Sequence, residues 1–211
     1  MTPLERGFFR RDPHLVAPEL IGKLIVSTAG DARVVARITE TEAYSDDDPA
    51  SHTYRGPTPR NAVMFGDPGH LYVYVSYGMH HCANVVSHTD GRSGGVLMRA
   101  AAILDGLDTA RRRRGNPRNA DYLGRGPGCL AQALGLNLAH GGTDLCRPVS
   151  AVRILTDGAR PQISSGPRVG VRLAADMPWR FWATGERSVS AYKRSPRAEP
   201  AIRTAARSID S

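Results

Sequence analysis

Two acidic residues and a tyrosine alternate in residues 39–44, a segment with the composition of a β-strand. Glu40, Glu42 and Tyr44 lie on one face if the strand is regular, because successive side chains point to opposite sides. A carboxylate beside an aromatic ring could act as a general base next to a platform for a planar ligand. The alternative, which the spacing alone favours, is a solvated strand edge with two surface glutamates.

A second group of aromatic residues occupies residues 70–77. Tyr72 and Tyr74 share a face, and aromatic residues two apart on a strand usually pack in a core or across to a neighbouring strand. The alternative is a surface on which a nucleobase stacks. Tyr77 precedes Gly78, where we expect a hairpin tip. A tip offers little cover for a large ring, so a functional role is favoured there.

The histidines and cysteines form no metal-binding pattern. His80, His81 and Cys82 are adjacent, so a strand cannot direct all three at one ion, and the chain has no H-E-x-x-H or C-x-x-C unit. The three cysteines are widely spaced and odd in number, which is typical of a reducing compartment. We therefore expect no metal site and no disulfide framework.

The charge of the chain indicates its class of partner. The chain has 211 residues, 28 of them basic and 20 acidic, which gives a formal net charge of +8. This length fits one domain, and the composition excludes wholesale disorder. A basic chain is attracted to polyanions such as nucleic acid in a salt-dependent way. Four consecutive arginines, at 111–114, are expected to form a solvated, anion-attracting surface.

The chain shows no signal for a membrane. No apolar run approaches the ~20 residues that a membrane-spanning helix requires. Charged residues interrupt the short apolar stretches near the N-terminus, so a secretion signal is not indicated. We expect a cytoplasmic protein without a membrane partner.

Hairpins and scattered helices are expected around these residues, without βαβ alternation. This pattern favours a single α+β domain on a mainly antiparallel sheet. Strands are expected at residues 23–28, 34–41, 70–77, 82–87, 95–103, 152–155, 168–173 and 180–183, and helices at 12–22, 105–114 and 126–135. Residues 45–69 form a long loop, which is typical of a functional segment. We expect a domain over residues 1–195 and a flexible tail over 196–211.

Longer motifs follow one another in a fixed order through most of the chain. They are T-E-T-E-A-Y from Thr39, His52, T-P-R-N-A-V-M-F from Thr58, P-G-H-L-Y-V-Y from Pro68, Y-G-M from Tyr77, Asn84, V-L-M-R-A from Val96, and G-P-G with L-A-Q-A-L from Gly126. This series closely resembles the alkyladenine (3-methyladenine) DNA glycosylase family, the mammalian-type enzymes that also occur in bacteria. The resemblance runs from about residue 15 to residue 192.

The resemblance implies a fold and an activity. The fold is a curved, mainly antiparallel sheet with surrounding helices and a protruding β-hairpin that inserts into DNA. The activity is that of a monofunctional glycosylase of base excision repair. Such enzymes bind the minor groove of double-stranded DNA, rotate an alkylated or deaminated purine out of the stack and hydrolyse its bond to deoxyribose. No metal or organic cofactor is implied, and we expect a monomer associated with the bacterial nucleoid through its DNA.

The resemblance also implies roles for seven residues. Glu42 is the catalytic residue that activates the attacking water. Tyr77 fills the space that the flipped nucleotide leaves, and Arg99 contacts the DNA backbone. The base pocket is implied to consist of Tyr44, His52, Tyr74 and Asn84. Asn84 screens purines by their 2-amino group, and the aromatic rings favour alkylated purines because these carry positive charge.

The sequence departs from the family at two places and leaves alternatives open. Cys129 stands where the family usually has a lysine, and His80 and His81 follow the expected hairpin tip. The alternatives are a DNA-binding protein of the same fold without catalysis, an enzyme acting on RNA or free nucleotides, and a metal-dependent hydrolase. The sequence does not rank 3-methyladenine, 7-methylguanine, hypoxanthine and ethenoadenine as substrates.

Overall fold

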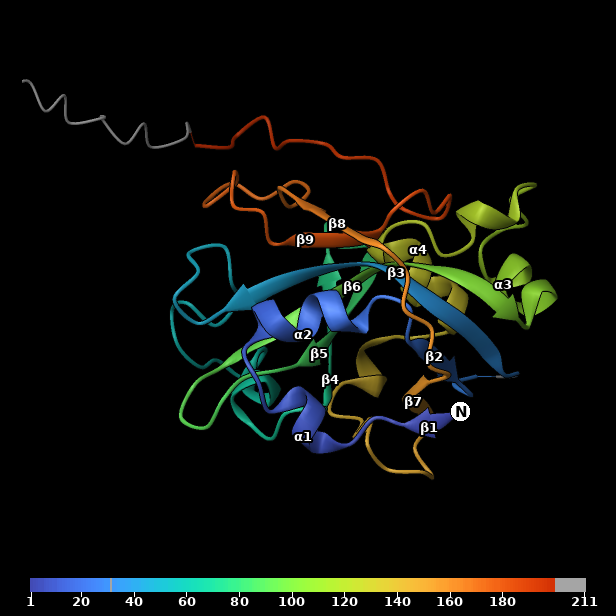
Figure 1. The fold of residues 1–211 in the computed structure, drawn as a ribbon, viewed down its shortest axis with the longest axis horizontal. Coiled ribbons are helices and arrows are strands. Elements are labelled where there is room, and N and C mark those ends of the chain that lie inside the picture. Colours follow the sequence, from blue (N-terminus) through green and yellow to red (C-terminus); the bar gives the residue numbers. More distant parts are fainter. Residues whose placement is uncertain (31, 200–211) are drawn as a thin grey trace, which may run out of the picture.

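A curved antiparallel sheet runs through the protein (Figure 1). The structure is a computed structural model that describes residues 1–30 and 32–199. Two long strands, β3 (Val34–Ser45) and β6 (Gly94–Asp105), pair along their length in the middle of the sheet. Valine and isoleucine are frequent in the first half of β3, and such β-branched residues pack well on a pleated surface.

The other strands extend the sheet on both sides of this central pair. They are β1 (Thr2–Pro3), β2 (Leu24–Ser27), β4 (Leu71–Ser76), β5 (His80–Val86), β7 (Val152–Thr156), β8 (Ile163–Gly166) and β9 (Arg180–Ala183). The strand order is β1-β7-β2-β3-β6-β5-β4, with β9 pairing with both β3 and β8. Every one of these pairings is antiparallel. The predicted α+β class is confirmed.

Short helices cover the sheet. They are α1 (Arg6–Phe9), α2 (Pro13–Leu20), α3 (Leu107–Arg113) and α4 (Pro127–Leu134), with 3₁₀ turns at Ala62–Phe65, Ala120–Tyr122 and Leu138–His140. Helix α2 packs mainly on β3 (Figure 1), and α4 packs on β5 and β6. Buried residues of both helices belong to the main hydrophobic core, among them Leu20 and Leu130.

Strands β4 and β5 form a hairpin that ends in Tyr77, Gly78 and Met79. Ser76 pairs with His80 directly below this tip. Gly78 has a φ of 71°, which favours glycine, and Tyr77 also has a positive φ of 49°. A side chain in the left-handed region costs about 1 kcal/mol, so the tip holds Tyr77 in a strained conformation.

One predicted strand is absent. Residues 168–173 have no strand conformation, and the strand in this region is β8 instead. Pro167 follows β8 directly, and proline lacks the N–H that a continuing ladder would need. The backbone beyond it turns towards β3, where the N–H of Val169 donates to the Glu42 side chain.

The expectation that residues 111–114 form only a solvated surface is wrong for two of the four arginines. Arg113 donates to backbone carbonyls that include that of Ala133, and Arg114 donates to the Leu123 carbonyl. Arg114 also contacts the Cys129 sulfur at 2.9 Å. These guanidinium groups therefore join helix α3 to α4, and the residue at the family's usual lysine position takes part in this junction.

Within the described residues, every helix is too short or too polar to cross a bilayer. The expected tail over residues 196–211 lies outside the described residues from residue 200 onwards.

Candidate active site

A cavity of about 500 Å³ opens beside the middle of β3. Such a volume is typical of small-molecule sites, and it exceeds that of one purine. The seven residues to which the sequence assigned roles come from four strands, the hairpin tip and the loop after β3. All seven line this cavity: Glu42, Tyr44, His52, Tyr74, Tyr77, Asn84 and Arg99. The structure therefore brings the whole predicted set together, while the role of each stays a prediction.

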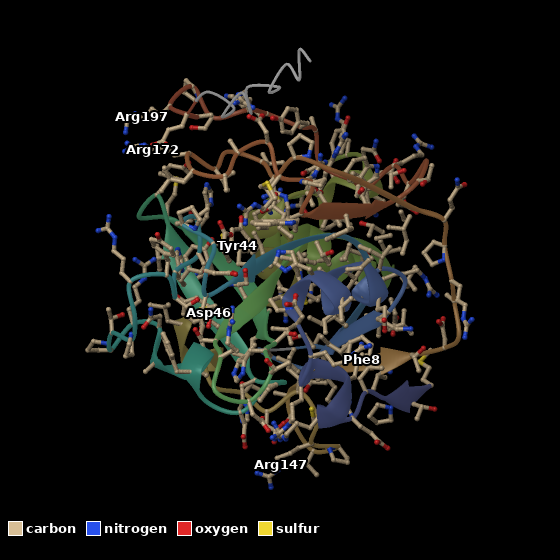
Figure 2. All side chains as sticks on the ribbon, turned by 60° about the vertical axis from the view of Figure 1, so that its left-hand side comes forward. Phe8, Tyr44, Asp46, Arg147, Arg172 and Arg197 are labelled. Carbon is tan, nitrogen blue, oxygen red and sulfur yellow. The ribbon has the colours of Figure 1, made fainter. Side chains whose placement is uncertain are left out.

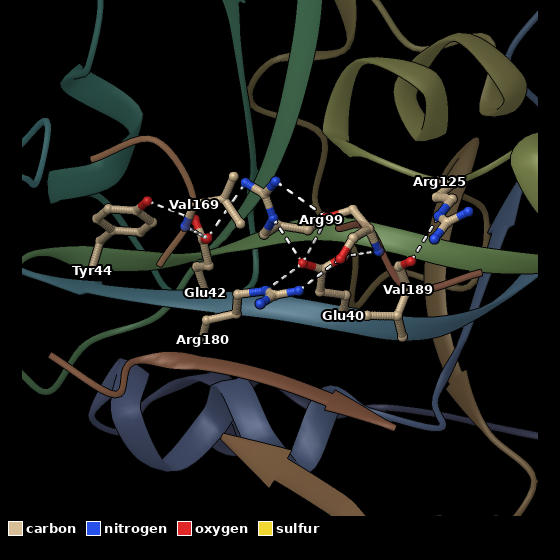
Figure 3. A network of polar contacts seen from close by, with 9 residues as sticks. Glu40, Glu42, Tyr44, Arg99, Arg125, Val169, Arg180 and Val189 are labelled. Atoms are coloured by element: carbon tan, nitrogen blue, oxygen red, sulfur yellow. Dashed lines mark hydrogen bonds and ion pairs between the residues drawn. The ribbon is translucent and has the colours of Figure 1, made fainter. Parts of the chain in front are cut away.

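Glu42 lies at the wall of this cavity with its side chain removed from bulk solvent. Three donors surround its carboxylate (Figure 3). The Tyr44 hydroxyl donates to Oε2 at 2.7 Å, the Val169 N–H donates to Oε1 at 2.7 Å, and Arg99 Nη1 lies 3.4 Å from Oε1. These three contacts hold the carboxylate in one orientation at the cavity wall. The interpretation of Glu42 as a surface residue on a strand edge is wrong.

Glu40, two residues earlier, anchors the arginine that faces Glu42. Its Oε1 accepts from Arg99 Nε at 3.1 Å and from Arg180 Nε at 2.6 Å, and its Oε2 accepts from the Ser190 N–H at 2.8 Å (Figure 3). Glu40 is also fully buried, so it is not a surface residue either. Two arginines thus balance two carboxylates, which offsets the cost of burying each charge.

Arg99 lies between the two carboxylates with most of its guanidinium enclosed. Burial opposes its charge, but Glu42 and Glu40 outweigh burial and raise the pKa of Arg99. The guanidinium also contacts Ser190 at 3.4 Å. These contacts hold Arg99 beside Glu42, and its contact with the DNA backbone stays a prediction.

One wall of the cavity consists of aromatic rings. The His52 and Tyr74 ring centroids are 4.6 Å apart at 71°, and those of Tyr72 and Tyr74 are 5.7 Å apart at 28°. His52 Nδ1 lies 3.0 Å from the Tyr72 hydroxyl. Tyr72 packs against Met64, which confirms core packing, and it also lines the cavity, while its stacking on a nucleobase stays a prediction.

The environment of these rings shifts their pKa values in the direction that favours the neutral forms. Burial raises the pKa values of Tyr44 and Tyr74, so both hydroxyls stay protonated. His52 is exposed as a residue, but its ring packs edge-on against the rings of Tyr72 and Tyr74, which cover it in part. This partial burial, and then the positive charge of Arg60, lower the pKa of His52 and keep its ring neutral.

Asn84 and Tyr77 lie at two ends of the same hairpin. The Asn84 amide donates to the Tyr72 carbonyl at 3.2 Å, which fixes its orientation at the cavity wall. Tyr77 is 89% exposed and Met79 is 71% exposed. Two large apolar side chains at one tip, uncovered, indicate a surface that meets a partner.

An ion pair that the sequence did not predict lies next to the backbone that binds Glu42. The guanidinium of Arg168 and the carboxylate of Asp48 are fully buried and make two hydrogen bonds with each other. Arg168 also donates to the Ala43 carbonyl at 3.0 Å, and it lies 4.5 Å from the Tyr44 ring centroid and 4.9 Å from that of Trp179. Because Val169 is the next residue, this ion pair holds the N–H that binds Glu42.

The C-terminal part of the described chain forms a further wall of the cavity. Residues 193–196 line it, and the Gly170 N–H donates to the Lys193 carbonyl at 3.0 Å. Arg194 pairs with Asp176. Figure 2 shows Arg172 and Arg197 projecting from the same edge of the molecule. Positive side chains thus border the cavity on this side, which suits a polyanion.

No group of three or more histidine, cysteine, aspartate or glutamate side chains within residues 1–30 and 32–199 is arranged to hold a metal ion. The polar groups of the cavity are a carboxylate, hydroxyls, an amide, an imidazole and arginines, which suit an organic ligand.

Comparison with known proteins identifies the family. The sequence profile of the methylpurine-DNA glycosylase (MPG) family matches residues 7–187. A protein of Streptomyces avermitilis named "Putative 3-methyladenine DNA glycosylase" is 46% identical, over 91% of this chain and 92% of its own length. Proteins with the same name from Nocardia farcinica and Rhodopseudomonas palustris are 48% and 49% identical, each over 89% of this chain and 90% of its own.

These matches confirm the resemblance that the ordered motifs indicated. DNA glycosylases are hydrolases that act on N-glycosyl bonds, and they work in DNA repair. The protein is therefore an enzyme with DNA as its substrate, and the chain belongs to the methylpurine-DNA glycosylase family.

Proposed function

We propose that this DNA glycosylase binds the minor groove of duplex DNA, turns an alkylated or deaminated purine into the cavity and hydrolyses its N-glycosidic bond with a water that Glu42 activates. The observation that carries the proposal is the buried Glu42 carboxylate, which faces an aromatic cavity of about 500 Å³. A stacked base cannot be reached by such a group, so the nucleotide has to leave the helix.

The proposed reaction needs one carboxylate. Each oxygen of an ionised carboxylate accepts about two hydrogen bonds, so Glu42 can bind a water in addition to Tyr44 and Val169. The water oxygen attacks C1′ of the sugar while its proton passes to Glu42. The N-glycosidic bond breaks, and its electron pair leaves with the base. A fixed anion near the oxocarbenium-like sugar stabilises the transition state.

The surrounding residues would select and hold the base. Tyr44 and Tyr74 would stack on a purine, His52 would add a wall and a hydrogen bond, and Asn84 would crowd out the 2-amino group of guanine. The partial cover of His52 and the fixed amide of Asn84 support these roles.

The exposed hairpin tip would fill the space that the flipped nucleotide leaves. Tyr77 suits this role because its ring is uncovered and its backbone is held in a fixed turn. Apolar side chains that enter the minor groove between base steps act in this way in other proteins. We expect the enzyme to act as a monomer. We also expect it to need no cofactor, because water itself is the nucleophile.

Release of free base from a set of duplexes, each with one lesion, tests this function. The set contains 3-methyladenine, 7-methylguanine, hypoxanthine and ethenoadenine, with an undamaged duplex as the control. We expect release from one or more lesion duplexes, an intact phosphodiester backbone and full activity in a chelator. A protein that binds an abasic duplex but frees no base from any lesion would be a DNA-binding protein without catalysis.

A further inference from the structure

A second cavity, of about 680 Å³, lies behind the aromatic wall of the first. Tyr72 and Tyr74 line both cavities, so these two residues of β4 lie between them. Arg60, in the loop after β3, lines the second cavity and does not line the first. A positively charged residue therefore lies next to the aromatic wall, on the side of the second cavity.

The guanidinium of Arg60 is held close to this wall. Its central carbon lies 5.6 Å from the Tyr74 ring centroid, and Nη2 donates to the Val75 carbonyl at 3.2 Å. Among the described residues, no carboxylate pairs with Arg60. The arginine behind the Tyr44 ring differs in this respect, because Asp48 neutralises Arg168. Of the two rings expected to stack on the base, only Tyr74 is thus backed by an unbalanced positive charge.

We propose that Arg60 is a specificity-determining residue that disfavours positively charged purines relative to neutral ones in the base pocket. The proposal rests on the proposed function, because it concerns the choice among lesions at that site. An aromatic ring attracts a cation through the negative potential of its face. A cation already on one face opposes a second cation on the other, whereas a neutral base feels almost none of this repulsion.

The size of the effect follows from the distance. A base stacked on Tyr74 lies about 3.5 Å from that ring, which places its charge about 9 Å from the guanidinium carbon if the two are in line. Arg60 is exposed, so the effective dielectric constant is close to that of water, and repulsion between unit charges at that distance changes a rate by about twofold to fivefold. His52 supports the argument, because Arg60 contributes to lowering its pKa and so already acts on a group in this pocket.

The experiment compares two lesions in one variant. Single-turnover base release is measured from duplexes with 7-methylguanine, at a pH where this base is positively charged, and with hypoxanthine, which is neutral. Arg60→Gln should raise the ratio of the 7-methylguanine rate to the hypoxanthine rate by about twofold to fivefold. Arg60→Lys keeps the charge and should leave the ratio near that of the unchanged enzyme.

Arg55→Gln is the matched control. Arg55 belongs to the same loop and is exposed like Arg60, but it lines neither cavity, so its replacement removes the same charge without changing the wall. In Arg55→Gln, the ratio of the 7-methylguanine rate to the hypoxanthine rate should equal that of the unchanged enzyme. If Arg60→Gln slows base release from both duplexes by the same factor, Arg60 is only a non-selective DNA contact and the proposal is wrong. If the unchanged enzyme releases no base from these two duplexes or from any other lesion duplex of the set, the proposed function itself fails, which is a separate outcome.

Discussion

Replacing Arg168 with methionine would leave Asp48 as a buried carboxylate without its counter-charge. Both side chains are fully buried, and Arg168 makes three hydrogen bonds to Asp48 and Ala43. Removal of one partner of a buried ion pair costs about 3–5 kcal/mol, which is a large share of the 5–15 kcal/mol that is typical of a domain. For a chain of this length the melting temperature should fall by about 6–20 °C.

The same variant should also slow base release, because the N–H of Val169 would lose its support next to Glu42. A hydrogen bond to a charged group contributes about 1.5–3 kcal/mol, so the single-turnover rate should fall by about 10- to 150-fold. Thermal unfolding measures the first effect, and release of free base at a temperature well below the transition measures the second.

A double variant separates stability from positioning. Asp48→Asn removes the unpaired charge and keeps the oxygen that accepts from the Ala50 N–H. Arg168→Met with Asp48→Asn should therefore regain most of the lost stability, while base release stays low. A double variant that regains both would show that Arg168 only stabilises the fold, and a single variant that melts within 2 °C or so of the unchanged protein would refute the ion-pair argument.

Three further outcomes follow from the site. Tyr44→Phe removes the hydroxyl that donates to Glu42 at 2.7 Å, so single-turnover base release should fall by about 10- to 150-fold and the melting temperature by about 3–12 °C; an unchanged rate would contradict this. Tyr77→Ser should change the free energy of unfolding by less than about 0.5 kcal/mol, because the ring is 89% exposed, yet it should weaken binding to an abasic duplex, and equal affinity by fluorescence anisotropy would argue against insertion. NMR titration should give His52 a pKa below the ordinary value of 6.5, and Arg60→Gln should raise it. Since the folded value is the lower one, His52 contributes stability above pH 6.5 that is lost as the pH falls through the folded pKa.

Local signals predicted most of the elements. Gly126 and Pro127 begin helix α4 and Gly135 ends it, as the sequence indicated. The alternating tyrosines predicted β4, and Gly78 predicted the turn after it. Such features depend on a few neighbouring residues, so the chain itself contains the information.

The support of the site depends on contacts that no local pattern contains. Arg168 and Asp48 are 120 residues apart, Arg180 and Glu40 are 140 apart, and Ser190 and Glu40 are 150 apart. Only the folded sheet brings such groups together.

The predicted strand over residues 168–173 fails for a related reason. Its alternating pattern is genuine, but the Val169 N–H donates to a side chain and not to a neighbouring strand. Departures from local rules often lie at functional sites. The ordered motifs identified the residues around the cavity, whereas the buried charges behind them required the structure.

The most direct test of the account is single-turnover base release by Glu42→Gln. Glutamine keeps the shape of the side chain: its amide oxygen can accept from the Val169 N–H, and its NH2 group can donate to the Tyr44 hydroxyl, which accepts as well as donates. It cannot take a proton from water. We expect base release to fall by at least about 100-fold, while the melting temperature and the affinity for an abasic duplex stay close to those of the unchanged protein. Full activity of a folded Glu42→Gln enzyme would contradict the claim that this carboxylate activates the water.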